Sequence, residues 1–329
     1  MMLFKAPART FGAALTLSVA LFLASCNGNG SKATSPDADN DTPTSGTIKV
    51  SIDNTFEPIL KSHIDTFQKL YQYAHVQAAY KPEREAMRDL LDDKVRAIIV
   101  ARGLKPDEQA VFDRQTIVPR VTHVATDGVA IILHPSNPDS LLTLAQLKAI
   151  FTGQVAEWKK VSGKASNLGK INPVFDQNNS STTRYVQDSV TRGAALAKEV
   201  FASESNPKLI DYVATHPNAI GVIGVNWISD QDDAQVQSFL RKIQVAAIGK
   251  RKVAAPSKPD DYVKPYQAYL ATQEYPLQRK LYVISREART GLGTGFASFV
   301  AGNQGQLIFL KSGLMPAVGQ VRLVQANKE

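Results

Sequence analysis

The chain after residue 46 alternates between short apolar runs and helical patterns, and this alternation constrains the fold more than any other feature. "TIKVSI" (47–52) and "VQAAY" (76–80) are typical of strands, and "VRAIIVA" (95–101) is nearly continuous in apolar residues, as in a strand covered on both faces. Apolar residues recur at helical spacing in the intervening segments 58–71 and 81–93. This order predicts a mostly parallel sheet between helices, and such sheets bind ligands beyond the carboxyl ends of their strands.

The same alternation continues toward the C-terminus. "DGVAIILHPSNP" (127–138), "NAIGVIGV" (218–225) and "RKLYVIS" (279–285) contain further strand patterns, whereas 142–153 and 295–313 are helical in spacing. The chain has 329 residues, of which 43% are apolar. Because single hydrophobic cores stop growing at roughly 250 residues, we expect an α/β protein of two lobes.

The N-terminus has the pattern of an export signal. Lys5 and Arg9 precede an uncharged apolar run at 11–23, which is too short to span a bilayer as a helix. The run ends in "LASC", which resembles the bacterial lipobox, so we expect residues 1–26 to be a lipoprotein signal peptide with Cys26 as the acylated residue. The alternative is an ordinary signal peptide with an incidental cysteine. Because Cys26 is the only cysteine, it cannot form an internal disulfide.

A polar segment follows the predicted lipidation site. Residues 27–46 contain no aromatic or branched aliphatic side chain, so they are expected to form a disordered tether between the lipid and a folded domain. The expected location is the cell envelope or periplasm, with attachment to a membrane through the lipid alone. Asn27 at the position after the cysteine leaves the choice of membrane open.

Charge and motifs argue against several other classes of protein. The net charge of +8 favours anionic ligands weakly, but no aromatic and basic motif of a nucleic-acid-binding module occurs. The five histidines lack metal-ligand spacing, and neither His-Glu-x-x-His nor Gly-x-Ser-x-Gly is present. "GLGTGF" (291–296) mimics a dinucleotide loop but lies too near the C-terminus for a βαβ unit, so a hinge or turn is expected there. We therefore expect no catalytic residue, metal or cofactor.

"VFDQNNSSTTRYVQDSV" (174–190) is the segment with the clearest binding chemistry. It combines the end of a strand, a polar loop at 176–183 and the start of a helix. Free backbone N–H groups at a helix start can bind an anion, and hydroxyl groups add donors. Four hydroxyl groups are clustered here, on Ser180, Ser181, Thr182 and Thr183. The alternative is that one hydroxyl caps the helix.

Several segments are similar to phosphate-binding proteins of bacterial ABC importers. "DGVAIILHPSNP" with "LTLAQLKAIFTGQVAEW", then "NAIGVIGV" and "YPLQRKLYVIS", follow the family's order and cover most of 48–316. The resemblance implies a type II periplasmic binding protein fold, in which two α/β lobes are joined by a hinge with a ligand cleft between them. The implied lobes are 47–127 with 272–329, and 128–271. The implied function is binding of phosphate, or a similar oxyanion, and its delivery to an ABC importer permease, by a monomer. The alternative is a sensor or scaffold lipoprotein of the same fold that binds another ligand.

The resemblance also implies binding residues. Thr55 stands where the family's first loop has a threonine beside the anion. The family's Gly-Ser-Gly-Thr turn corresponds to 180–183, which keeps the serine and threonine as Ser181 and Thr183 but lacks both glycines. Four residues before the serine, the family usually has an arginine that pairs with the anion, whereas this chain has Gln177.

Other residues are candidates for the missing charge. Arg84 lies in the second loop, Arg102 follows the third strand in "ARGL", and Arg96 stands where an aspartate is common. We expect Arg84 or Arg102 to supply the charge, the alternative being that both are surface arginines. Asp53 and Asp176 are candidates to accept the proton of hydrogen phosphate, which sulfate lacks.

Overall fold

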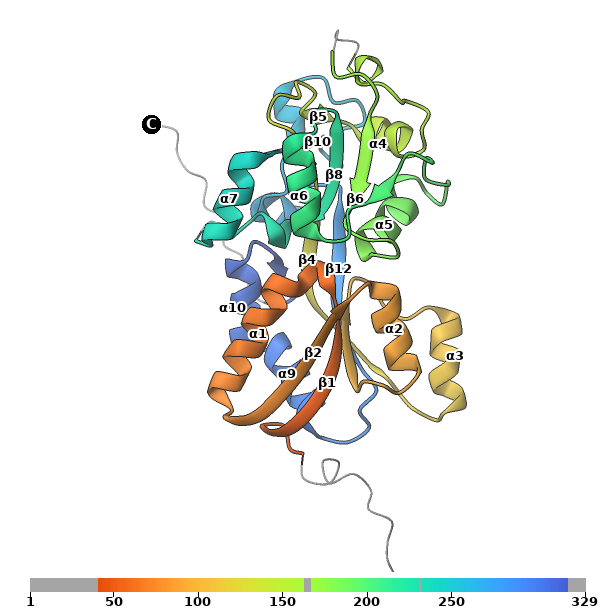
Figure 1. Ribbon diagram of the computed structural model, residues 1–329. Coiled ribbons are helices and arrows are strands. Elements are labelled where there is room, and N and C mark those ends of the chain that lie inside the picture. Colours follow the sequence, from red (N-terminus) through yellow and green to blue (C-terminus); the bar gives the residue numbers. More distant parts are fainter. Residues whose placement is uncertain (1–40, 163–166, 231, 319–329) are drawn as a thin grey trace, which may run out of the picture. The chain divides into compact units, whose positions relative to one another are not determined.

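The computed structural model describes residues 41–162, 167–230 and 232–318. The predicted signal peptide, Cys26 and most of the predicted tether lie outside these residues. Within the described residues, no helix is long and apolar enough to cross a membrane. The secondary-structure elements form two α/β lobes, which Figure 1 shows below and above the level of β4 (Arg120–Leu133) and β12 (Gln278–Ser285).

The first lobe has a mixed sheet with helices on both faces. Its strands are β1 (Ser45–Asp53), β2 (Tyr73–Lys81), β3 (Ala97–Val100), β12 (Gln278–Ser285), the first part of β4 (Arg120–Leu133) and β13 (Met315–Pro316). Its helices are η1 (Asn54–Phe56), α1 (Glu57–Leu70), α2 (Glu83–Leu91), α3 (Pro106–Arg114), α9 (Leu292–Ala301) and α10 (Asn303–Lys311). Strand β1 runs parallel to β2 on one side and to β3 on the other, while β12 is antiparallel to β3. The predicted β-α-β-α-β order is therefore confirmed.

The apolar patterns of the sequence explain how this lobe packs. Ile59, Ile64 and Phe67 of α1 are buried with residues of β1 and α9 in one cluster, and a second cluster lies under α2 and α3. Figure 1 accordingly shows α1 and α9 on one side of the sheet and α2 and α3 on the other. Each fully buried side chain of this size contributes about 1.5–3 kcal/mol. With both faces covered, β3 is buried at every position, as its continuous apolar run predicts.

The second lobe has its own sheet and a small additional one. Its strands are the second part of β4, β6 (Asn172–Phe175), β7 (Phe201–Ala202), β8 (Ala219–Gly224) and β9 (Gln244–Val245), with β5 (Leu141–Leu142), β10 (Ala247–Gly249) and β11 (Tyr262–Val263) in the small sheet. Its helical segments are α4 (Leu144–Phe151), η2 (Trp158–Lys160), α5 (Ser181–Tyr185), η3 (Val186–Val190), α6 (Asn206–Thr215), η4 (Val225–Trp227), α7 (Ala234–Lys242), η5 (Pro259–Asp261) and α8 (Gln267–Ala271). Trp158 is fully buried in the core of this lobe, and its Nε1 donates to the carbonyl of Asn218 at 2.9 Å.

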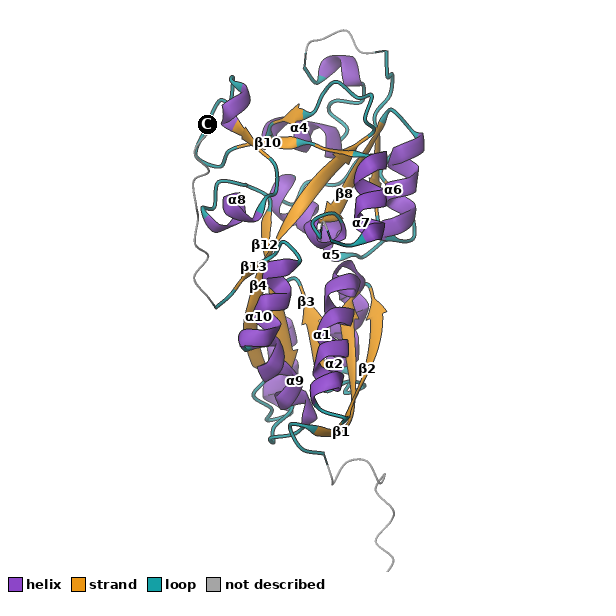
Figure 2. Ribbon diagram, turned by 90° about the vertical axis from the view of Figure 1, so that its left-hand side faces the viewer, coloured by secondary structure: helices purple, strands orange, loops and turns teal. Residues whose placement is uncertain are grey.

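Strands β4 and β12 join the lobes (Figure 2). Strand β4 pairs with β12 up to Gly128 and then with β8 from Val129 onward. A strand that changes partner in this way belongs to both lobes. The partner change supports the predicted ranges 47–127 with 272–329, and 128–271, which we keep as a proposal.

The folded part begins earlier than the predicted end of the tether at residue 46. Strand β1 starts at Ser45, and Asp41 is 6% exposed. The Asp41 carboxylate accepts a hydrogen bond from the backbone N–H of Leu292 at 2.7 Å and pairs with Arg96. A segment without aliphatic side chains is thus held by an ion pair and by free N–H groups at the start of α9, which hydrophobicity does not reveal.

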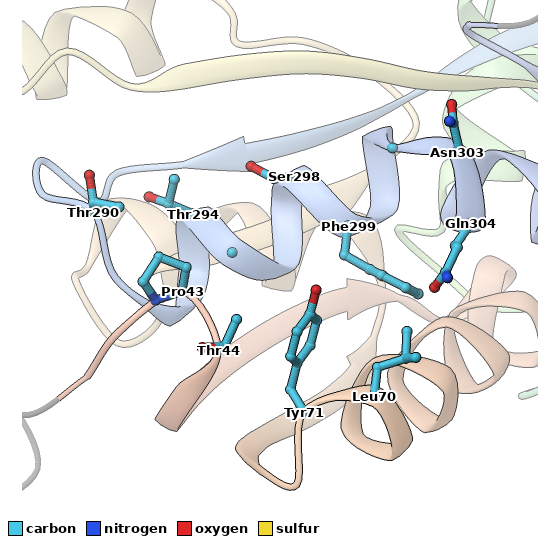
Figure 3. A pocket seen from close by; sticks show the side chains of 12 residues that line it. Pro43, Thr44, Leu70, Tyr71, Thr290, Thr294, Ser298, Phe299, Asn303 and Gln304 are labelled. Atoms are coloured by element: carbon cyan, nitrogen blue, oxygen red, sulfur yellow. The ribbon is translucent and has the colours of Figure 1, made fainter.

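The glycines of the "GLGTGF" motif leave space for this N-terminal segment. The motif forms the start of α9, and Figure 3 shows Pro43 beside Thr294 of that helix. A Cβ on Gly295 would lie 1.8 Å from the carbonyl oxygen of Pro43, and one on Gly291 would lie 2.5 Å from Oδ1 of Asp41. The glycines therefore allow close contact with the chain's own N-terminal segment, at the start of a helix rather than in the expected hinge or turn.

Candidate functional site

The loop after β1 reaches from the first lobe to the second. Asp53 is fully buried, and its Oδ1 accepts from the backbone N–H of Thr55 at 3.0 Å. The carbonyl of Thr55 accepts hydrogen bonds from two side chains of η4, Asn226 Nδ2 at 3.0 Å and Trp227 Nε1 at 2.7 Å. The backbone of Thr55 is therefore held by contacts from both lobes.

Most of the clustered hydroxyl groups form hydrogen bonds within their own loop. Ser180 is the N-cap of α5, where its Oγ accepts from the N–H of Thr183 at 3.2 Å, so a capping role is present. Thr182 Oγ1 donates to Asp176 Oδ1 at 2.6 Å, and Thr183 Oγ1 donates to the carbonyl of Gln177 at 3.2 Å. These three hydroxyls stabilise the loop and its helix start.

Ser181 is the member of the cluster that contacts the opposite loop. Its Oγ lies 3.2 Å from Thr55 Oγ1 and accepts from Arg279 Nη1 at 2.8 Å. Arg279 is 5% exposed and lies on β12, one of the two strands shared by the lobes. Its Nε donates to Asp127 Oδ2 at 2.9 Å, and its guanidinium carbon lies 5.0 Å from the centre of the Phe56 ring. Its Nη2 is buried without a hydrogen-bond partner among the described residues.

Arg279 is the residue that sequence reasoning missed. The segment "RKLYVIS" was interpreted only as a strand, and Arg279 stands at its first position. The available signal was an arginine at the start of an otherwise apolar strand pattern, since a buried arginine must be paired or bind an anion. The pairing with Ser181 and Asp127 depends on contacts about 100 and 150 residues away in the chain, which local patterns do not contain.

The site contains carboxylates as well as the guanidinium. Burial, followed by the nearby Glu83 carboxylate, raises the pKa of Asp53 from its ordinary 3.8 to about 7, although Arg279 acts in the opposite direction. Burial likewise raises the pKa of Asp127, against the attraction of Arg279. Asp53 can therefore accept or donate a proton near neutral pH.

Glu83 links the lobes beside this site. Arg184 of α5 donates to it through Nε at 2.5 Å and Nη2 at 3.1 Å. The backbone N–H of Ala101 donates at 3.1 Å, and Nε of Arg102 lies 3.4 Å from the same carboxylate. Glu83 is 2% exposed, so this is a buried ion pair between α2 of the first lobe and α5 of the second.

The predicted cationic candidates are placed elsewhere. Arg102 forms a bidentate pair with Glu108, at 2.6 and 2.7 Å, and Arg84 is an exposed residue whose Nη1 donates to Asn179 at 3.4 Å. Arg96 holds Asp41, as described above. Neither Arg84 nor Arg102 forms a hydrogen bond with Thr55 or Ser181 within the part of the chain that the structure describes.

Gln177 forms a neutral contact between the lobes. Its Oε1 accepts from Asn54 Nδ2 at 2.7 Å, and its Nε2 donates to the carbonyl of Glu204 at 2.6 Å. Asp176 is fully buried, with Oδ2 lacking a partner among the described residues. Over the same residues, no group of three or more His, Cys, Asp or Glu side chains is arranged to hold a metal ion.

Comparison with known proteins gives the family of the chain. A model of the PBP superfamily domain matches residues 37–304. The chain belongs to this superfamily. Its relatives include the phosphate-binding protein PstS of Bacillus subtilis, 23% identical over 292 residues that make up 87% of each protein. The PstS of Pseudomonas aeruginosa strain PAO1 is 22% identical over 291 residues, covering 84% of this chain and 85% of that protein.

Solved structures support the same fold. A Clostridium perfringens structure described as a phosphate ABC transporter substrate-binding protein with bound phosphate has a TM-score of 0.69, with 20% identity over 83% of this chain and all of that one. A phosphate transport receptor from Vibrio cholerae has a TM-score of 0.62, with 19% identity over 82% of this chain and all of that one. The fold of this superfamily member is that of a type II periplasmic binding protein, as the sequence predicts.

Proposed function

We propose that this protein binds inorganic phosphate, or a similar oxyanion, between its lobes and delivers it to an ABC importer. The names of the relatives support phosphate as the ligand, and they describe binding proteins rather than enzymes. The observation that carries the proposal is the buried guanidinium of Arg279, which donates to Ser181 and has a further buried N–H group without a partner among the described residues.

The residues around Arg279 suit a tetrahedral oxyanion. An arginine remains charged at any physiological pH and can donate two parallel hydrogen bonds to one anion. The hydroxyls of Thr55 and Ser181 supply donors from opposite lobes. Asp53, whose carboxyl group titrates near neutral pH, can accept the proton of hydrogen phosphate, and a site with such an acceptor disfavours sulfate.

Entry of the anion requires the lobes to separate. Because Thr55 and Ser181 have no exposed surface and Arg279 is 5% exposed, an ion can reach them only when the lobes move apart. The change of partners along β4 gives the place where the chain can bend. We therefore infer a hinge at β4 and β12, with Arg279 carried on the second of these strands.

Calorimetric titration of the mature chain tests the assignment. The wild type is expected to bind phosphate, and to bind sulfate more weakly. The affinity of Arg279→Met for phosphate should be lower by about 30-fold or more, since removing a buried charged partner costs 2–5 kcal/mol. Arg286→Met is the matched control, because Arg286 is also buried but bonds to the Leu90 carbonyl and to Gln115. Equal losses in both variants, or no phosphate binding by the wild type, would contradict the proposal.

The same fold could serve a sensor or scaffold lipoprotein that is not coupled to import. This second candidate is favoured by the loop at 177–183, which has Gln177 in place of the family's arginine and lacks both glycines of the family's turn. Reconstitution with the permease and ATPase of a phosphate ABC importer would separate the two, since only an importer component stimulates phosphate uptake. Lipid attachment at Cys26 remains part of the proposal, as does the monomeric state. Mass spectrometry of the N-terminal peptide tests the first, and light scattering tests the second.

A further inference from the structure

Glu83 places a carboxylate at the edge of the sheet where α/β folds bind their ligands. It begins α2 after β2 and Pro82, at the same edge as Asp53, which ends β1, and Ala101, which follows β3. The carboxyl ends of parallel strands form the ligand side of such a sheet. Burial, and then the charge of Glu83, raises the pKa of Asp53, so the two carboxyl groups lie near each other. The chain thus has a negative charge of its own on the ligand side.

The donors around Glu83 come from both lobes, as they would around a bound anion. Its Oε1 accepts from Arg184 Nε at 2.5 Å, and its Oε2 accepts from Arg184 Nη2 and from the N–H of Ala101, both at 3.1 Å. Nε of Arg102 lies 3.4 Å from Oε1. Arg184 belongs to α5 of the second lobe, whereas Ala101 and Arg102 follow β3 of the first. A guanidinium that donates to both oxygens of a carboxylate is a strong and specific anion contact.

Capping of its own helix does not explain this arrangement. A carboxylate in the first turn of a helix commonly accepts hydrogen bonds from the free N–H groups of that helix. Among the described residues, the donors to the oxygens of Glu83 are Ala101 and Arg184, and neither belongs to α2. The carboxylate is 2% exposed as a residue and points to the second lobe instead.

Each partner keeps a contact within its own lobe when the lobes separate. Arg184 also donates through Nη1 to Asp188 Oδ2 at 3.2 Å, one turn further along the chain. Glu83 keeps the N–H of Ala101 and the charge of Arg102. Breaking a buried ion pair costs most when one charge is left uncompensated. Because neither charge is left alone here, the contact can open and close reversibly.

We propose that three groups, the side chains of Arg184 and Arg102 and the N–H of Ala101, form an anion-binding site for a carboxylate. The chain fills this site with Glu83, and this internal anion closes the lobes in the absence of solute. The inference goes beyond the proposed function, because it concerns other arginines than Arg279 and applies whichever solute the protein binds.

Chemical rescue of Glu83→Ala tests the site. The substitution removes one CH₂ group and the carboxylate, and acetate supplies the same heavy atoms with the same charge. In small-angle scattering of the mature chain, without phosphate, Glu83→Ala should have a larger radius of gyration than the wild type. Acetate should return the radius to the wild-type value, with a dissociation constant on the order of 1 mM for an untethered ion. Acetamide, which has the same shape but no charge, should leave the radius unchanged.

Glu287→Ala is the matched control. Glu287 is also buried and also bonded to an arginine, Arg96, and to a backbone N–H, that of Thr294, but all three residues belong to the first lobe. Its removal should leave the radius of gyration unchanged, with or without acetate. Arg184→Met is a second variant, which removes the same contact from the other lobe. It should increase the radius and show no response to acetate.

Three results would overturn the proposal. If Glu83→Ala has the radius of the wild type, its carboxylate does not hold the lobes together. If acetamide acts as acetate does, or if acetate acts equally on Arg184→Met, the site does not bind an anion through Arg184. If Glu83→Ala fails to fold, Arg184→Met decides alone, and an unchanged radius refutes the inference. None of these measurements involves phosphate, so the calorimetric test of Arg279 stays independent of them.

Discussion

The substitution Asp53→Asn tests the electrostatics of the site through the pH dependence of stability. Burial and the Glu83 carboxylate raise the pKa of Asp53 from 3.8 to about 7 in the folded protein. Between pH 4 and pH 7 the folded state therefore holds a proton that the unfolded state has released. Because the folded state binds more protons in this window, the free energy of unfolding decreases as the pH rises through it.

The size of the effect follows from the pKa difference. A shift from 3.8 to about 7 corresponds to about 4 kcal/mol at 1.36 kcal/mol per pKa unit. Above pH 7 the folded wild type contains a buried carboxylate, whereas asparagine remains neutral and keeps an oxygen to accept the Thr55 N–H. Asp53→Asn should therefore be more stable than the wild type by up to about 4 kcal/mol at pH 8, and nearly equal to it at pH 4.

Urea unfolding of both proteins at pH 4, 6 and 8, in buffer without phosphate, measures this difference. The wild-type curve alone is ambiguous, because burial lowers the pKa of His63 to about 4 and makes stability increase with pH over part of the same window. His63 is present in both proteins, so its contribution cancels in the difference. A difference that does not change with pH, or a variant less stable than the wild type at pH 8, would refute the reasoning.

Two further substitutions test contacts described above. Gly295→Ala places a Cβ 1.8 Å from the carbonyl oxygen of Pro43, so the segment before β1 should detach and be cleaved faster in limited proteolysis. Gly103→Ala is the control, because its Cβ would lie in open space and the cleavage rate should stay unchanged. Glu83→Gln removes the ion pair with Arg184 and should increase the radius of gyration in small-angle scattering. An unchanged radius would show that this pair does not hold the lobes together.

The sequence predicted the elements because their patterns are local. The apolar alternation around β1, β2 and β3, and the helical spacing between them, are contained within single segments and survive in the structure. The N-terminal boundary of the folded part was missed because Asp41 is held by Arg96 and by the start of α9, through contacts that are distant in the chain. Only the topology brings these segments together.

The sequence predicted the two loops that meet between the lobes, but not the arginine that contacts Ser181 there. Thr55 and Ser181 come from different loops and meet at 3.2 Å, as the family resemblance implies. The positive charge that Gln177 lacks was sought in loops, on Arg84 and Arg102. A strand residue, Arg279, contacts Ser181 instead. A loop position can be aligned by its sequence motif. Which side chain of a strand faces the space between the lobes depends instead on the register of that strand in the sheet.

The position of Arg279 also affects how ligand binding and closure are coupled. In the described conformation Glu83 and Arg184 join the lobes through the protein's own charges, so closure does not depend on the ligand alone. A contact of this kind favours the closed state with or without ligand. The apparent affinity for the ligand then equals the intrinsic affinity multiplied by the fraction of molecules that are open to entry. Arg279 contributes differently, because its Nη2 has no partner among the described residues and an anion would supply one. If Arg279 binds the oxyanion as proposed, the balance between Arg184 and Arg279 sets how strongly the oxyanion, rather than Glu83, determines closure.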